Sequence, residues 1–169
     1  MTDTSAARAA RAAARRADQD TNLFSRLVAT ATASRGQAKR LLHASAGLSI
    51  TEWRILWDLA VAGPLSVQDM ASIQRTDHSL ISRALPVMRD KGYIKTARAA
   101  DDKRQSLVDL TEAGRHVFAM AAPTMKRRRE SLNAAFDDAE MHLFLDLLAR
   151  FEALLDHPIE VDTPLQNVP

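Results

Sequence analysis

Three short helical segments followed by an abrupt change to a two-residue period constrain this chain most. Each segment opens with a side chain that can cap a helix. Ser49 precedes the first segment, Ser66 the second, and Asp77 a third that ends at Gly92. Two short strand-like runs follow, at residues 93–96 and 106–110, with a charged hairpin tip between them. The order predicts a mainly α fold that carries one small β-hairpin.

Longer helical patterns lie on both sides of this region. One begins at Leu23 and ends at Gly47, and another begins after Thr111 and runs to about residue 135. A last helix, capped by Asp137 or Asp138, has an apolar seam with heptad-like spacing. The seam consists of Met141, Phe144, Leu148, Phe151 and Leu155. We expect four parts: a flexible Ala/Arg-rich arm (1–20), a helical dimerisation region (21–47 and 112–157), a winged helix-turn-helix DNA-binding domain (48–111) and a flexible tail (158–169).

The N-terminal arm allows three readings. Arg8, Arg11 and Arg15 share one face if the segment is helical. A frayed arm or helix extension is the plainest interpretation, a DNA-contacting arm is the functional one, and an organellar transit peptide is a minor alternative.

Composition excludes several function classes. The 169 residues include no Cys, which rules out disulfides, thiol redox sensing and Cys nucleophiles. The five His residues show no close ligand pairing, so we expect no metal site and no cofactor. No nucleophile–base pair or phosphate loop appears, and we expect no enzyme activity. No stretch approaches the ~18 apolar residues of a membrane span, so we expect a cytoplasmic protein without a membrane partner.

Charge is distributed unevenly along the chain. Residues 1–50 hold 8 basic and 3 acidic side chains, and residues 51–129 hold 14 and 9. Residues 130–169 hold 1 basic and 9 acidic side chains, and Arg supplies 18 of all 23 basic residues. The basic first three-quarters favour an anion-binding face, because Arg suits phosphate and groove recognition. A solvated basic surface is the alternative.

The helix after Asp77 has the side chains of a DNA-reading helix. Its period predicts that Leu80, Ile81, Ala84 and Leu85 face inward and leave short polar and cationic side chains outside. Such a helix enters the major groove N-terminus first. The hairpin tip adds Asp102, Lys103 and Arg104, where an acidic side chain can orient an Arg for the minor groove. Together these segments predict a winged helix-turn-helix.

The same segments resemble the MarR family of bacterial transcriptional regulators. The resemblance covers residues 48–115 and is carried by segments 48–56, 63–71, 77–83, 91–94 and 102–115. It implies that Arg104 is the wing arginine, that Asp102 positions it, and that Ser79, Ser82 and Arg83 contact DNA. The full set expected to contact double-stranded DNA is Ser66, Thr76, His78, Ser79, Ser82, Arg83, Asp102, Lys103 and Arg104.

The resemblance also implies a homodimer that grips a pseudo-palindrome and responds to a small aromatic carboxylate. His43, Trp53 and Arg54 lie near where the effector cleft of such a protein opens. The plainer interpretation is that Trp53 belongs to the core and Arg54 to the surface.

From the resemblance we expect a homodimeric repressor. The alternative is a winged-helix adaptor that binds proteins, which exposed apolar residues on the recognition face would favour. Pro86 should kink the recognition helix.

Overall fold

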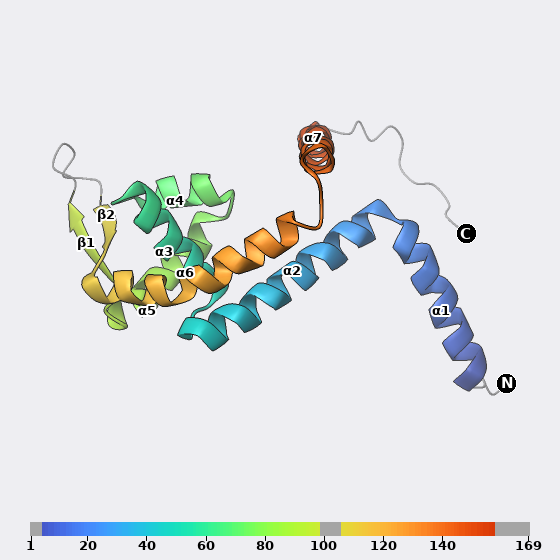
Figure 1. Cartoon of the computed structure of the whole chain (residues 1–169), viewed down its shortest axis with the longest axis horizontal. Helices are drawn as coiled ribbons and strands as arrows, with labels where there is room; N and C mark the ends of the chain where they lie inside the picture. Colours follow the sequence, from blue (N-terminus) through green and yellow to red (C-terminus); the bar gives the residue numbers. More distant parts are fainter. Residues whose placement is uncertain (1–4, 99–105, 158–169) are drawn as a thin grey trace, which may run out of the picture. The chain divides into compact units, whose positions relative to one another are not determined.

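A computed structural model describes residues 5–98 and 106–157. Its element order is α1 (Ser5–Thr21), α2 (Leu23–Ala46), α3 (Ile50–Ala62), α4 (Val67–Gln74), α5 (His78–Asp90), β1 (Ile94–Arg98), β2 (Ser106–Leu110), α6 (Glu112–Asn133) and α7 (Asp138–Leu155) (Figure 1). The mainly helical fold with one antiparallel hairpin confirms the expected fold class. The chain divides into two compact units, residues 1–126 and 127–169.

The helices begin where local capping chemistry places them. The Ser49 side chain accepts from the Glu52 amide, and the Glu52 carboxylate accepts in return from the Ser49 amide. Ser66 and Asp69 form the same reciprocal pair at the start of α4. These capping boxes satisfy amides that would otherwise lack partners at the helix ends. The expected starts of α3 and α4 are therefore confirmed.

The β-hairpin is anchored to the connection between α3 and α4. Its two strands pair antiparallel, with Ile94 opposite Leu110 and Arg98 opposite Ser106. In the middle of β2, the Leu65 amide donates to the Val108 carbonyl over 3.1 Å, and the Val108 amide donates to the Leu65 carbonyl over 2.8 Å. This isolated bridge adds one more backbone pairing to the hairpin. The hairpin is thus fixed through β2 to the helical part of the first unit.

One core holds the first unit together. Its fully buried large side chains are Leu42, Leu48, Ile55, Leu56, Met70, Ile81, Met88 and Val108. They come from α2, α3, α4, α5, β2 and the α2–α3 connection. The first half of α6 closes this core with Val117 and Ala121. Helices α2 to α6 and the hairpin therefore share a single apolar cluster.

Helix α6 approaches the end of α5 closely at Gly114. A Cβ built on Gly114 would lie 2.0 Å from the Tyr93 carbonyl oxygen, which is far inside van der Waals contact. The Thr111 hydroxyl accepts from the Gly114 amide at 3.0 Å, as expected for the residue that caps α6. Only glycine fits this position without a shift of the backbone.

The second unit is dominated by α7, whose N-terminus is capped by Asp137. The helix contains no buried residue, although it carries eight Leu or Phe side chains after residue 142. Met141, Leu148 and Phe151 of the seam are half-buried, whereas Phe144 and Leu155 are exposed. Within the described ranges, no helix combines the length and apolarity needed to cross a bilayer.

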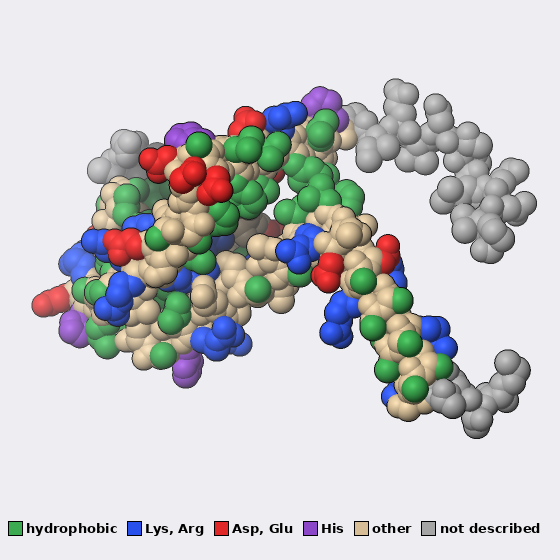
Figure 2. Space-filling view, turned by 45° about the vertical axis from the view of Figure 1, so that its right-hand side comes forward, with side chains coloured by type: hydrophobic (Ala, Val, Ile, Leu, Met, Phe, Trp, Pro, Cys, Tyr) green, Lys and Arg blue, Asp and Glu red, His purple; other side chains and the backbone are tan. Residues whose placement is uncertain are grey.

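Helix α1 occupies most of the segment expected to form a flexible arm. It runs from Ser5 to Thr21 and buries no side chain. Asn22 lies between α1 and α2. It caps α2, because its side chain accepts a hydrogen bond from the Ser25 amide. The basic side chains along α1 in Figure 2 are all Arg, because the helix contains no Lys. Of the readings of the arm, the helix extension matches this structure, and its contact with DNA remains a prediction.

Candidate nucleic-acid interface

The turn between α4 and α5 is held by partly buried hydrogen bonds. Gln74 is 7% exposed and donates through Nε2 to the Asp58 carboxylate at 2.6 Å. The Arg54 guanidinium donates to the Gln74 carbonyl at 2.7 Å. Arg75 then adopts a left-handed backbone conformation, with φ of 46°, and ends α4. These contacts tie the turn to α3 and fix the direction in which α5 begins.

Asp77 starts α5 as the sequence predicts. Its carboxylate accepts from the Ser79 amide at 2.7 Å. Hydrogen bonding from the backbone and hydroxyl of Ser79 lowers the pKa of Asp77 below its ordinary value, with a smaller contribution from Arg83. The cap is therefore ionised at neutral pH, and the first turn of α5 is held in helical form.

The polar side chains of the first two turns pair with one another. The Arg83 Nε donates to the Ser79 carbonyl at 3.1 Å, and its Nη2 lies 3.4 Å from the Ser79 hydroxyl. His78 Nδ1 lies 3.2 Å from the Ser82 hydroxyl. Ser82 is half-buried, whereas His78, Ser79 and Arg83 are exposed. The structure thus brings these four expected residues together at the N-terminal end of α5.

The expected burial of Leu80 is wrong. Leu80 is 42% exposed, whereas its neighbour Ile81 is fully buried. Successive residues of a helix are about 100° apart, so only one of the two can face the core directly. The helix also continues through Pro86 to Asp90. Pro86 is exposed and lies beyond the turns that carry the polar side chains.

Of the remaining residues expected to contact DNA, two lie among the described residues and three do not. Ser66 is 5% exposed, and its hydroxyl is bonded within the chain to the amide and carboxylate of Asp69. Thr76 is half-buried in the turn before α5. Asp102, Lys103 and Arg104 lie outside the described residues.

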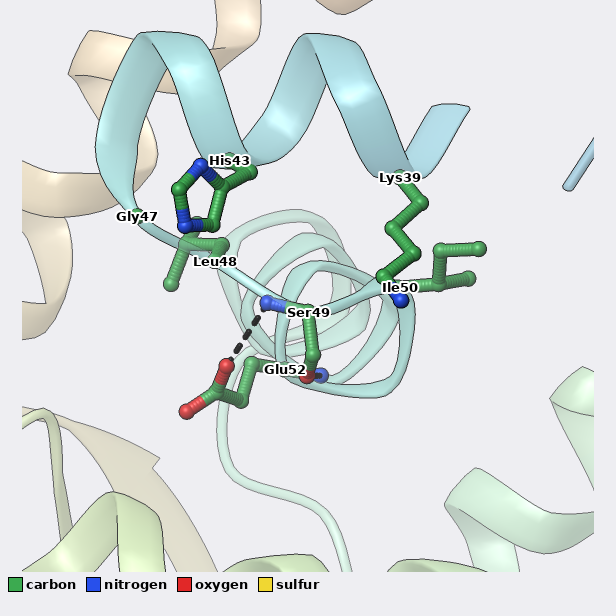
Figure 3. A pocket seen from close by; sticks show the side chains of 7 residues that line it. All are labelled: Lys39, His43, Gly47, Leu48, Ser49, Ile50 and Glu52. Carbon is green, nitrogen blue, oxygen red and sulfur yellow. Dashed lines mark hydrogen bonds between the residues drawn. The ribbon is translucent and has the colours of Figure 1, made fainter. Parts of the chain in front are cut away.

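A hollow of about 310 Å³ opens where α2 meets the start of α3 (Figure 3). Lys39 and His43, one turn apart on α2, lie on one side of it, and Ser49 and Glu52 lie on the other. Leu48 and Ile50 are the apolar side chains of its lining, and Gly47 also borders it. The hollow combines an apolar floor with two cationic or titratable side chains and one carboxylate.

Glu52 is the most constrained side chain of this hollow. It is 6% exposed and accepts from the Lys91 ammonium at 2.6 Å as well as from the Ser49 amide at 2.8 Å. Burial alone would raise the pKa of Glu52, but the hydrogen bonds from Lys91 and Ser49 outweigh it and lower the pKa below 4.5. Glu52 therefore stays ionised at neutral pH and joins the start of α3 to the end of α5.

The structure separates the three residues expected at an effector cleft. His43 lines the hollow, but Trp53 and Arg54 do not. Trp53 is 7% exposed and stacks on Phe118, with ring centres 5.3 Å apart. Arg54 is exposed and bonds to Gln74. Sequence reasoning missed Lys39, whose position four residues before His43 was the available signal. Across the described segments, no cluster of three or more His, Asp or Glu could hold a metal ion.

The helices α3 to α5 and the antiparallel hairpin form a winged helix-turn-helix. Residues 46–105 match the model of the MarR family. Over this segment the chain resembles the MarR family, and its curated relatives are named HTH-type transcriptional regulators. The sequence-based resemblance to the family is confirmed.

Two curated relatives illustrate the similarity. An uncharacterised HTH-type transcriptional regulator of Bacillus subtilis, YwoH, is 26% identical over 105 residues, which are 62% of this chain and 76% of the relative. The HTH-type transcriptional repressor IacR of Pseudomonas putida is 30% identical over 67 residues, 40% of each chain.

Solved structures show the same architecture. A MarR/EmrR family regulator from Acinetobacter is 26% identical, with a TM-score of 0.72, over 81% of this chain and 96% of that one. PcaV from Streptomyces coelicolor, solved with its natural ligand, is 19% identical, with a TM-score of 0.67 and the same coverage. An E. coli MarR mutant bound to operator DNA is 18% identical, with a TM-score of 0.59, over 78% of this chain and 99% of that one. The last two likenesses concern the fold alone.

Proposed function

We propose that this protein is a homodimeric repressor that binds a pseudo-palindromic operator through α5. The observation that carries the proposal is the first two turns of α5, where exposed His78, Ser79 and Arg83 surround a firmly capped helix start. A guanidinium in this position can pair bidentately with a guanine in the major groove. Thr76 adds a hydroxyl just before the helix. Ser66 contributes by capping α4, because its own hydroxyl is already bonded.

The wing completes the interface in this proposal. Its strands are described up to Arg98 and from Ser106, and the sequence between them contains Asp102, Lys103 and Arg104. A basic side chain at a hairpin tip fits the narrow, electronegative minor groove. Arg104 is assigned to that groove, with Asp102 orienting its guanidinium and Lys103 contacting phosphate.

Exposed apolar side chains support the dimer. Helix α7 exposes Leu143, Phe144, Leu145, Leu147, Leu154 and Leu155. Apolar side chains gather along this helix in Figure 2. Leu23, Phe24 and Val28 at the start of α2 are also more than half exposed. Such surfaces mark interaction sites in soluble proteins, and a second copy of the chain supplies a matching apolar surface.

The repressor role draws on the relatives. IacR is named a transcriptional repressor, and the E. coli MarR mutant was solved with operator DNA. A dimer that covers a promoter site blocks transcription by occupancy alone. Two α5 helices in successive major grooves would read half-sites about 10 base pairs apart.

The direct test is binding to the promoter of the protein's own gene. Fluorescence anisotropy with a labelled promoter duplex and an unrelated duplex of equal length would measure the sequence preference. We expect tight binding to the promoter only, with log K falling against log salt at about −0.9 per phosphate contacted. Equal affinity for both duplexes would refute the operator, and a response independent of salt would refute DNA binding.

The hollow at His43 favours a second element of function, release by a small aromatic acid. Its volume of about 310 Å³ lies at the lower end for small-ligand sites. The Lys39 ammonium takes the role expected of Arg54, pairing with the carboxylate of the ligand, while Leu48 and Ile50 contact its ring. Trp53 supports this floor from the core.

Thermal shift with salicylate, benzoate and their thioesters would test this effector site. At saturation, we expect a ligand that fits to raise the melting temperature and to weaken promoter binding. Lys39→Met should abolish the shift, whereas Arg54→Met should retain it. A shift that survives Lys39→Met would place the ligand elsewhere.

A further inference from the structure

Leu80 is an exposed apolar residue in the first turn of α5, where its exposed neighbours His78 and Ser79 are polar. It is 42% exposed, between exposed Ser79 and fully buried Ile81. The core is complete without it, since Ile81 and Met88 are the α5 side chains that are fully buried there. Leu80 therefore needs another explanation than packing within the chain.

The surroundings of Leu80 indicate what it contacts. Leu80, Ala84 and Val87 line one shallow groove along α5, together with Arg83 and Lys91. Leu80 and Arg83 are three residues apart and so are neighbours on the helix surface. Arg83 is held back toward the helix start by the Ser79 carbonyl at 3.1 Å. The Arg83 guanidinium and the Leu80 side chain thus lie next to each other near the N-terminal end of α5, which enters the major groove in the proposed function.

We propose that Leu80 reads the 5-methyl group of a thymine adjacent to the guanine bound by Arg83. The inference rests on the proposed function, in which α5 enters the major groove. Thymine is the one standard base that presents a methyl group in that groove, and apolar side chains recognise it by contact. Arg83, the cation beside Leu80, complements the negative charge of DNA. A purely apolar protein partner would not require such a cation.

The position of Leu80 distinguishes it from Val87 in the same groove. Val87 is 50% exposed, but it lies seven residues further along α5. That separation corresponds to about 10 Å of helix. Because a recognition helix contacts bases with its N-terminal residues, Leu80 reaches the bases and Val87 does not.

Thymine replacement in a selected operator tests the inference. The full-length protein would first select duplexes from a random library, and each thymine of the selected site would then be replaced by deoxyuridine, which removes the methyl alone. We expect one such replacement per half-site to weaken binding of the wild type about fourfold, the equivalent of ~0.8 kcal/mol for one buried methyl. In Leu80→Ala, the same replacement should have no effect.

Val87→Ala is the matched control, because it removes a comparable exposed side chain from the same groove. It should keep the full dependence on the thymine methyl. The inference is overturned if no thymine methyl matters to the wild type, or if Leu80→Ala remains as sensitive as the wild type. If selection yields no preferred duplex at all, the DNA-reading function fails and this inference fails with it. In that case a protein-docking role of the groove is favoured.

Discussion

The Lys91 ammonium donates to the Glu52 carboxylate at 2.6 Å, across 39 residues of sequence. Glu52 belongs to the capping box that starts α3, and Lys91 follows the last residue of α5. The same carboxylate borders the hollow beside His43. One side chain therefore contacts the proposed effector site and the end of the recognition helix. A ligand that displaces Glu52 would free the end of α5.

Glu52→Gln should make stability less dependent on pH in acid. The lowered pKa of Glu52 means that its contribution is fully present above about pH 4.5 and is lost as pH falls through the lower folded pKa. At pH 7 we expect a loss of about 1 kcal/mol in the free energy of unfolding, since Lys91 is partly solvated. Urea titrations from pH 7 to pH 3 should show the difference from wild type shrinking.

Asp146→Asn is the control for this experiment. Asp146 pairs with Arg150 at 3.8 Å, and both side chains are more than 60% exposed. Its removal should change stability by less than about 0.5 kcal/mol. A Glu52→Gln variant with an undiminished acid response would show that the pair does not stabilise the fold.

Gly114→Ala should destabilise the first unit. The added methyl would lie 2.0 Å from the Tyr93 carbonyl oxygen, so α6 or the end of α5 must move. We expect a loss of about 1–3 kcal/mol. Gly36→Ala serves as the comparison, because its nearest neighbour is Arg40 at 3.6 Å and Ala favours helices. Calorimetry should give a lower melting temperature for the first variant and an equal or higher one for the second.

Arg104→Ala should weaken operator binding by more than tenfold while the fold is retained. The reason is the loss of a minor-groove contact at the hairpin tip. Arg98→Ala, at the end of β1, removes an equal charge without that contact and should cost less. Anisotropy at one fixed salt concentration, with circular dichroism as the check on folding, would measure both. Equal losses of operator affinity in the two variants would show that Arg104 contributes its positive charge and no specific minor-groove contact.

Phe144→Glu should shift the protein from dimer to monomer. Phe144 is 49% exposed on the seam of α7, so a carboxylate there would have to be desolvated in an apolar interface. Ala149→Glu puts the same charge on a position of α7 away from the seam and should leave the dimer intact. Sedimentation velocity at micromolar concentration distinguishes them. A Phe144→Glu variant that remains dimeric would exclude this seam.

Local signals made most of the helix starts predictable. Ser49, Ser66 and Asp77 each cap the helix expected of them, because a cap depends on residues two or three positions away. The second strand, Ser106–Leu110, was also predictable from its alternation. The resemblance to the MarR family and the expectation of a DNA-reading helix rest on the same local patterns.

Features that depend on distant residues were not predictable. Nothing local indicates that Glu52 meets Lys91 or that Arg54 meets the Gln74 carbonyl. The exposure of Leu80 was missed, because two adjacent apolar residues in a helix do not reveal which one the core accepts. Trp53 near an expected cleft looked equally suited to bind a ligand, but its stacking on Phe118 makes it part of the core.

The paired backbone bonds between Leu65 and Val108 fix the middle of β2 to the connection between α3 and α4. Both partners lie outside the segment 99–105, and both bonds use main-chain atoms. The sequence of that segment is therefore open to exchange with little effect on where the hairpin emerges. Grafting tips from other regulators onto these strands offers a way to vary the proposed minor-groove contact while the proposed reading of the major groove by α5 is kept.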